Sequence, residues 1–150
     1  MKKNEEILSK LPYASPFLFV DELEHIDEEG AEGSFYLDPQ LDFYKGHFRD
    51  YPITPGVILI EIMAQIGLVC LGLYLTKETA KQKTGTFVLV ATEVAFLKPV
   101  YPGETVRVKS KKIFFRFGKL KCEVSMYNEQ EAVVCEGNIS GMLKRENGKT

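Results

Sequence analysis

A histidine beside a proline-rich loop, and an acid on the apolar segment that follows, are the residues of this sequence best suited to chemistry. His47 lies in Gly46-His47-Phe48, and Glu61 follows among apolar side chains. Neutral imidazole is the usual general base near neutral pH. A carboxyl group with apolar neighbours loses hydration, which favours its protonated form and suits it to act as an acid. This pair of groups fits the removal of water from a carbonyl compound.

Two further residues fit beside this pair. Gly56 follows Pro55, which pre-sets the backbone for the start of a helix. A helix N-terminus offers unpaired N–H groups and partial positive charge, and glycine lets a ligand approach closely. Such a site can hold a thioester oxygen while negative charge builds on it. Gln65 is four residues after Glu61, so the two share a helix face and the amide can orient the carboxyl group.

The elements that must position these residues are a long helix and a set of strands. The segment from Pro55-Gly56 to Leu75 is apolar all round, which predicts a helix enclosed on every side. A spanning helix of this length is the alternative, but Glu61 and Gln65 inside it favour burial in protein. Strands are predicted before it at 17–26 and 31–37, and after it at 86–96, 104–115, 120–127 and 132–143.

This layout predicts an α+β fold in which a curled antiparallel sheet wraps one long buried helix. A helical turn is expected near 7–10, and a polar exit from the helix at 76–85. The chain of 150 residues reads as one domain, 1–150. No internal repeat or linker is evident.

Bulk composition narrows the function classes. The net charge of −2 gives no reason to expect a nucleic-acid partner. The first residues carry positive charge without an apolar stretch behind them, so we expect no signal peptide and a start at or near Met1. The odd number of cysteines lacks paired spacing, which argues against a disulfide framework or a zinc site and fits the cytoplasm. Those cysteines are Cys70, Cys122 and Cys135.

Each candidate residue also has a plain structural interpretation. A histidine in a Gly-His-Phe turn can simply cap or pack, and Pro-Gly at a helix start is common. A single glutamate in an apolar helix is harder to explain structurally, because a buried charge without a partner is costly. The combination of His47, Gly56 and Glu61 in this order is stronger than any one of them.

In this order the residues resemble the signature of the 3-hydroxyacyl-[acyl-carrier-protein] dehydratases of the FabZ type. The matching motifs are Gly46-His47-Phe48, Pro55-Gly56-Val57, and Glu61 followed by Gln65. Two other stretches are similar to the family: the opening at 11–21 and the later segment at 95–104. The sister FabA type carries Asp where Glu61 stands, which favours the FabZ type.

The resemblance implies a hotdog fold and a homodimer or larger homo-oligomer that pairs two sheets edge to edge. It also implies a composite site, with the histidine from one subunit and the acid from its neighbour. His47 would remove the proton next to the thioester carbonyl, and Glu61, oriented by Gln65, would assist departure of the hydroxyl. The Gly56 N–H would steady the carbonyl oxygen, and Phe48 and Val57 complete the substrate-binding set.

The implied substrate is a 3-hydroxyacyl chain on acyl carrier protein, in fatty-acid or polyene-type lipid biosynthesis, with no metal or organic cofactor. The chain departs from the family pattern at Tyr13-Ala14-Ser15, Arg49-Asp50, Thr54 and Thr92-Glu93-Val94, which leaves the acyl specificity open. Two alternatives stay open as well. One is a hotdog acyl thioesterase, and the other is a non-catalytic subunit that binds acyl carrier protein.

Positive charge concentrates on one predicted hairpin. An acidic acyl carrier protein could dock on such a patch. The other interpretation, which we favour from the sequence alone, is a solvated strand face that resists edge pairing. The residues are Lys109, Lys111, Lys112, Arg116, Lys119 and Lys121.

Overall fold

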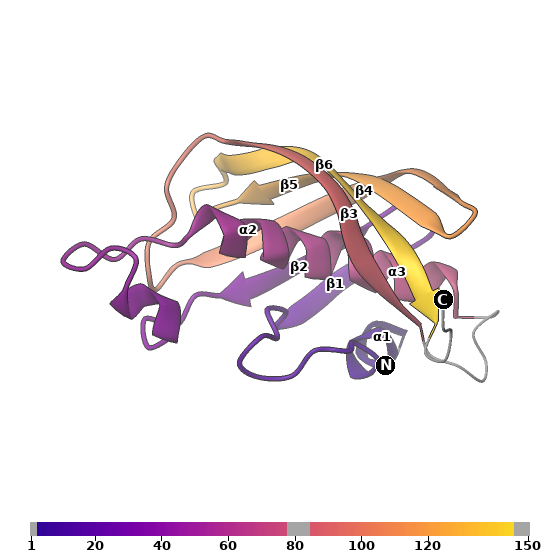
Figure 1. The fold of residues 1–150 in the computed structure, drawn as a ribbon, viewed down its shortest axis with the longest axis horizontal. Helices are drawn as coiled ribbons and strands as arrows, with labels where there is room; N and C mark the ends of the chain where they lie inside the picture. Colours follow the sequence, from indigo (N-terminus) through magenta and orange to yellow (C-terminus); the bar gives the residue numbers. More distant parts are fainter. Residues whose placement is uncertain (1–2, 78–84, 146–150) are drawn as a thin grey trace.

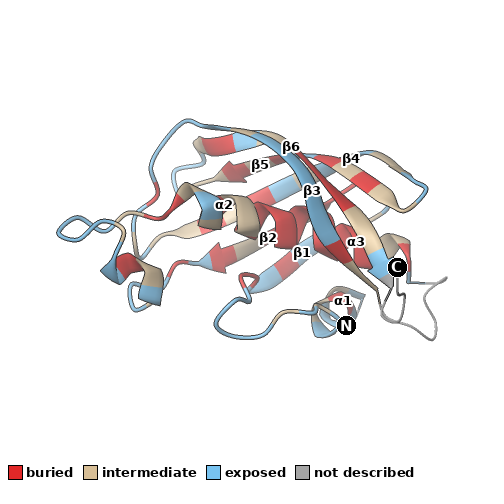
Figure 2. Ribbon diagram, in the orientation of Figure 1, coloured by how far each residue is buried: buried red, intermediate tan, exposed pale blue. Residues whose placement is uncertain are grey.

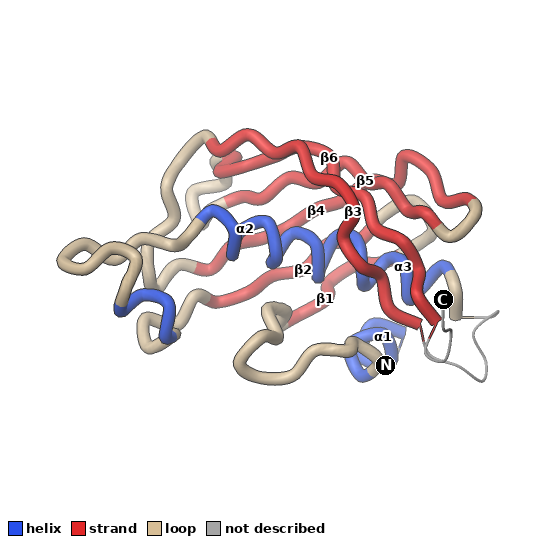
Figure 3. Tube along the Cα trace, in the orientation of Figure 1, coloured by secondary structure: helices blue, strands red, loops and turns tan. Residues whose placement is uncertain are grey.

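The protein folds as a curled antiparallel sheet around a single long helix. The structure is a computed structural model that describes residues 3–77 and 85–145. The sheet has six strands in the order β1-β2-β4-β5-β6-β3, and every neighbouring pair is antiparallel (Figures 1 and 3). The strands are β1 (Glu22–Ile26), β2 (Ala31–Tyr36), β3 (Gly85–Phe96), β4 (Thr105–Arg116), β5 (Lys119–Tyr127) and β6 (Val133–Arg145).

The central helix runs without a break through three segments. These are α2 (Gly56–Met63), η2 (Ala64–Val69) and α3 (Cys70–Leu75). It lies across the concave face of the sheet, and its buried stretch faces the strands (Figure 2). Gly56–Leu75 is long and apolar enough to cross a membrane, but 72% of its most apolar window is buried inside the protein. The helix is therefore the core of this fold, as the sequence predicted.

The middle of this helix differs from the expected regular α-helix. Segment η2 is π-helical, and the Cys70 N–H donates to the Gln65 carbonyl, five residues earlier. All of its residues are buried. Short π-helical turns inside α-helices are frequent near functional sites. Here the wider turn follows directly after the segment that carries Glu61.

The predicted strand at 17–26 is wrong in its first half, because β1 covers only Glu22–Ile26. Residues before it form a turn in which the Phe17 N–H donates to the Ala14 carbonyl. The central helix, rather than a neighbouring strand, binds the backbone at Phe17 and Phe19. A helix α1 (Lys3–Ser9) precedes this segment and starts earlier than the expected turn at 7–10.

The other strand predictions agree with the structure to within two residues at each end. A short 3-10 helix, η1 (Asp42–Lys45), leads into the loop that carries His47. The polar exit expected at 76–85 lies largely outside the described residues.

Strand β3 forms one edge of the sheet and exposes apolar side chains. Its only partner in the described part of the chain is β6. A long edge strand with exposed apolar residues is a template for pairing with another chain. The exposed residues are Val88, Leu89, Val90 and Phe96.

We expect the substitution Gly137→Ala to destabilise the fold, because β3 and β6 pack closely at this position. A Cβ at Gly137, which lies opposite Val94, would come within 2.0 Å of the Glu93 carbonyl oxygen. Backbone atoms on a paired strand cannot easily move aside, so the cost should be about 2 kcal/mol or more. Urea unfolding measures it. Gly46→Ala is the control, since nothing lies within 4 Å of a Cβ there. Equal stabilities of the two variants would contradict this description of the sheet.

Candidate active site

His47 sits in a tight loop in which, within residues 3–77 and 85–145, only one of its ring nitrogens is hydrogen-bonded. Its Nδ1 lies 3.0 Å from the Ile53 carbonyl oxygen. A carbonyl only accepts hydrogen bonds, so Nδ1 carries the proton and Nε2 keeps its lone pair. The imidazole also stacks on the Phe48 ring, with centroids 4.2 Å apart. In its neutral form the ring is thereby oriented so that Nε2 can take a proton.

The His47 loop is anchored at both ends. Backbone hydrogen bonds close it on itself, including one of 2.8 Å from the Ile53 N–H to the His47 carbonyl. The Thr54 N–H donates to the Val100 carbonyl, and the Thr54 hydroxyl lies 2.5 Å from the hydroxyl of buried Tyr44. Thr54 is one of the departures from the family pattern. In this chain it ties the loop to the core through a hydrogen bond that an apolar residue could not make.

Glu61 is held by a fully buried amide on the next turn of the central helix. Gln65 donates to a Glu61 carboxylate oxygen at 2.9 Å and to the Phe17 carbonyl at 3.0 Å. Its side-chain oxygen accepts from the Phe19 N–H at 2.8 Å. The predicted pairing of Glu61 with Gln65 is therefore present. The same amide also fixes the N-terminal segment over this part of the helix.

Burial shifts the protonation of Glu61. Loss of hydration raises the pKa of this carboxyl group above its ordinary value, and the Gln65 hydrogen bond opposes that effect. Tyr13 lies close enough that the Glu61 charge, after burial itself, helps to raise the pKa of its phenol. The site thus combines a carboxyl group biased towards its acid form with a neutral phenol. The sequence marked Tyr13 only as a departure from the family pattern, and nothing in it placed the phenol near Glu61.

Gly56 begins α2 beneath an aromatic ring. Its N–H belongs to the first helical turn, where backbone donors have no partner within the helix. A Cβ at this position would lie 3.1 Å from the half-exposed Phe96 ring, so a larger residue would require that ring to shift. A groove of about 290 Å³ opens beside it, lined by Thr54, Gly56, Leu59 and residues 96–100. Val57 and Phe48 are exposed at 73% and 53%, ready for contact with a ligand or a second chain.

The structure does not bring all of the predicted residues together within one chain. Glu61 and Gln65 are joined directly, and Gly56 starts the same helix. Over residues 3–77 and 85–145, however, no hydrogen bond or ring contact joins His47 to Glu61. The hydrogen bonds within one chain therefore fix the acid and the base separately and do not join them.

Several known proteins are similar to this chain in sequence. The family described as the FabA-like domain matches residues 11–139. A 3-hydroxyacyl-[acyl-carrier-protein] dehydratase FabZ from Clostridium perfringens is 36% identical, with 93% of this chain and 96% of the relative covered. The enzyme of the same name from Caldicellulosiruptor saccharolyticus is 37% identical, with 92% and 96% covered.

Solved structures share the fold at lower identity. The dehydratase heterocomplex ApeI:P from Xenorhabdus doucetiae has a TM-score of 0.77 at 14% identity, covering 94% of this chain and 92% of that one. A hypothetical thioesterase with coenzyme A from Streptococcus pneumoniae has a TM-score of 0.61 at 10% identity, covering 95% and 97%. The likeness establishes the hotdog fold that the sequence predicted.

The raised pKa of Glu61 predicts a pH-dependent effect of Glu61→Gln on stability. In the unfolded chain the carboxyl group titrates near 4.5, and in the folded protein it titrates higher. The cost of burying the charge is therefore absent below 4.5 and fully present above the folded pKa. The free energy of unfolding of Glu61→Gln should therefore rise relative to the unsubstituted protein as the pH increases from 4.5 through the folded pKa. Urea unfolding at several pH values measures this, with exposed Glu28→Gln as the control. A difference independent of pH would show that Glu61 is not desolvated.

Proposed function

The chain belongs to the FabA-like domain family, and on that premise we propose that it removes water from 3-hydroxyacyl thioesters on acyl carrier protein, giving trans-2-enoyl thioesters. The observation that carries this proposal is the half-buried carboxyl group of Glu61, held by Gln65 on an otherwise apolar helix. The FabZ enzymes to which the chain is similar support it. The pathway is fatty-acid or polyene-type lipid biosynthesis.

The residues take complementary parts in this reaction. Nε2 of His47 accepts the proton from the carbon next to the thioester carbonyl, and the Gly56 N–H donates to the carbonyl oxygen as charge builds on it. The protonated Glu61 carboxyl group gives its proton to the departing 3-hydroxyl, which leaves as water. The electrons of the broken C–H bond form the new double bond. Imidazolium and carboxylate then return to their starting forms by proton exchange with solvent.

Two chains are needed to complete the site in this proposal. No hydrogen bond or ring contact joins His47 to Glu61 within the described part of one chain, and the β3 edge exposes apolar residues suited to pairing. We propose a homodimer in which the β3 edges meet, so that His47 of one protomer faces Glu61 of its partner. Phe48 is exposed on the His47 loop, and Val57 is exposed at the start of α2. Both would contact substrate or the partner protomer there. Each protomer would be a single domain.

Acyl carrier protein is the proposed carrier of the substrate, and the cationic hairpin supports it. Lys109 and Lys111 lie exposed on β4, and Lys111 faces Glu123 across to β5. An acidic protein would be drawn to this surface by complementary charge. The cytoplasm is the proposed compartment, in keeping with three buried free cysteines.

Hydrolysis by a thioesterase is not favoured, since the thioesterase neighbour shares only the fold. The direct test incubates the protein with 3-hydroxyacyl carrier proteins of several chain lengths and follows the products by mass spectrometry. Loss of one water from the acyl group is expected. Release of free carrier thiol, or no product at any chain length, would contradict the proposal.

The composite site predicts complementation between two inactive variants. His47→Ala and Glu61→Gln should each lose at least ~10²-fold in kcat, because each removes a proton-transfer group. A mixed dimer would hold one site with both groups intact and one with neither. Random mixing of equal amounts should therefore restore about a quarter of the unsubstituted activity. Measuring kcat after co-expression or subunit exchange checks this.

His47→Ala mixed with His47→Gln is the matched control, which should restore nothing. Absence of recovery in the His47→Ala and Glu61→Gln mixture, with mixed dimers shown to be present, would place both groups in one chain.

Charge reversal on the β4–β5 hairpin should change KM for the carrier-bound substrate but not for a substrate without the carrier protein. We expect Lys109→Glu with Lys111→Glu to raise KM about 10-fold for the carrier-bound substrate by weakening docking. KM for the same acyl group on a short pantetheine thioester should not change. Lys45→Glu, on η1, is the control. Equal effects on both substrates would mean that the hairpin does not act through the carrier protein.

A further inference from the structure

The turn of the β4–β5 hairpin carries an exposed aromatic side chain, Phe117, which we call the Phe117 knob. Its two-residue turn is Phe117-Gly118, and both residues have positive φ, 51° and 78°. Such turns favour Asn-Gly, and a bulky residue at positive φ is strained. Phe117 is nonetheless 95% exposed. The turn therefore presents a large apolar ring that is free to contact another surface.

Cationic side chains surround this knob. Arg116 and Lys119 are cross-strand partners directly beside the turn. Lys121 lies opposite Phe114, two residue pairs further from the turn, and the Arg116 guanidinium lies 4.2 Å from the Phe114 ring centroid. The apolar Phe117 ring is thus surrounded by a cationic collar of Arg116, Lys119 and Lys121. Its complement would be a groove with apolar residues at its base and an anionic rim.

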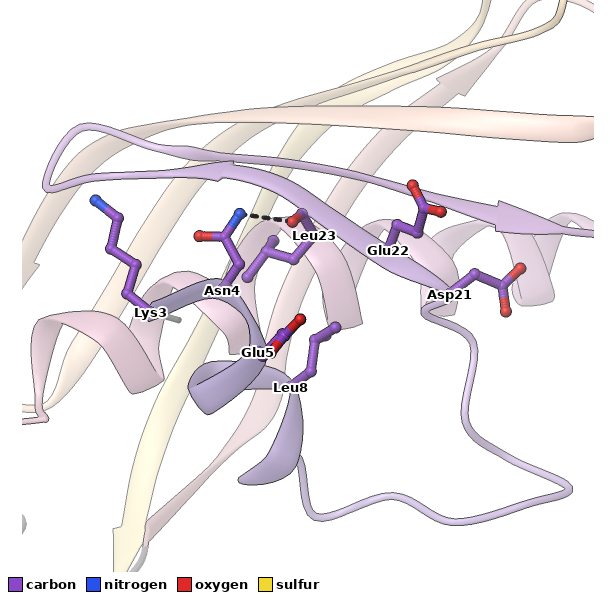
Figure 4. A pocket seen from close by; sticks show the side chains of 7 residues that line it. All are labelled: Lys3, Asn4, Glu5, Leu8, Asp21, Glu22 and Leu23. Atoms are coloured by element: carbon purple, nitrogen blue, oxygen red, sulfur yellow. Dashed lines mark hydrogen bonds between the residues drawn. The ribbon is translucent and has the colours of Figure 1, made fainter. Parts of the chain in front are cut away.

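The same chain carries a groove of that description between α1 and β1. Its volume is about 680 Å³, within the range of pockets that hold drug-sized ligands. Leu8 and Leu23 supply apolar surface, and Glu5, Asp21 and Glu22 supply three carboxylates. Figure 4 shows where these side chains leave the helix and the neighbouring strand, with Asn4 bridging the two elements.

The remaining groups of the groove do not close it. Asn4 donates to the Leu23 carbonyl at 2.7 Å, which occupies one backbone acceptor of the edge strand β1. Lys3, the only cation lining the groove among the described residues, lies with its ammonium 5.6 Å from the Tyr74 ring centroid. Asp21 accepts a hydrogen bond from the Tyr36 N–H at 2.7 Å, whereas no ion pair among the described residues engages Glu5 or Glu22. These two carboxylates therefore stay available to a cationic partner.

We propose that the Phe117 knob of one copy of this chain seats in the α1–β1 groove of another copy. Charge complementarity favours this occupant, because the collar of Arg116, Lys119 and Lys121 would meet Glu5, Asp21 and Glu22. The contact is heterologous, since knob and groove are different surfaces, so it links chains into a closed ring or an open array. It is separate from the β3 edge and does not depend on the enzymatic activity.

Sedimentation velocity of the full chain in low and high salt tests this contact. At low salt we expect species larger than the β3-paired unit, which dissociate at about 1 M NaCl because salt screens the charge pairs. Phe117→Ser should weaken this assembly about 10-fold or more, since it removes one buried ring. Tyr101→Ser, which changes an exposed aromatic just before β4 that lies neither on the hairpin nor in the groove, is the matched control and should assemble normally.

A charge swap identifies the groove. Arg116→Glu should weaken assembly, Glu22→Arg should weaken it too, and the two substitutions together should restore it. The chain contains no tryptophan, so Phe117→Trp places a single fluorophore on the knob whose emission should shift to the blue on assembly.

Three results would overturn the proposal: no species beyond the basic unit at low salt, normal assembly of Phe117→Ser, or no rescue by the charge swap. Weaker binding of acyl carrier protein or of anionic vesicles by Phe117→Ser, with assembly unchanged, would assign the knob to that partner instead.

Discussion

The structure depends on one polar group that the apolar interior must satisfy, the side-chain amide of Gln65. It is completely buried, and a buried amide is costly unless its hydrogen bonds are made. Its three partners are the Phe17 carbonyl, the Phe19 N–H and the Glu61 carboxyl group. This single amide therefore closes the N-terminal segment over the helix and sets the position of the candidate acid. Any change that leaves it unpaired would disturb fold and chemistry together.

The same constraint explains why Glu61 suits an acid's role. A carboxyl group on a helix enclosed by a sheet loses hydration, and one hydrogen bond from Gln65 does not fully replace it. His47 is fixed independently, through the Ile53 carbonyl and the loop that Thr54 anchors. The two groups are thus pre-oriented on separate elements, with the Gly56 N–H at the start of the helix between them in the chain. In the proposed dimer, a second protomer would bring its His47 close to this Glu61.

The sequence predicted the central helix and most strands because burial on all sides and β-branched runs are strong local signals. It also predicted the Glu61–Gln65 pairing, which follows from helical spacing. The first half of the predicted strand 17–26 failed, because Phe17 and Phe19 hydrogen-bond to Gln65, a tertiary contact with no local signature. The π-helical turn and the approach of Tyr13 to Glu61 were invisible for the same reason. The geometry of His47 depends on the Ile53 carbonyl, which spacing alone does not locate.

The most direct test is an experimental structure of the assembled protein with a 3-hydroxyacyl pantetheine amide. Its shape resembles the substrate, but it dehydrates more slowly because an amide acidifies the neighbouring C–H bond less than a thioester does. The account predicts His47 Nε2 within reach of the carbon next to the carbonyl, and Glu61 within hydrogen-bond distance of the 3-hydroxyl. The two side chains should come from different protomers, and the Gly56 N–H should point at the carbonyl oxygen. A ligand that contacts neither side chain, or only one in every assembly, would contradict it.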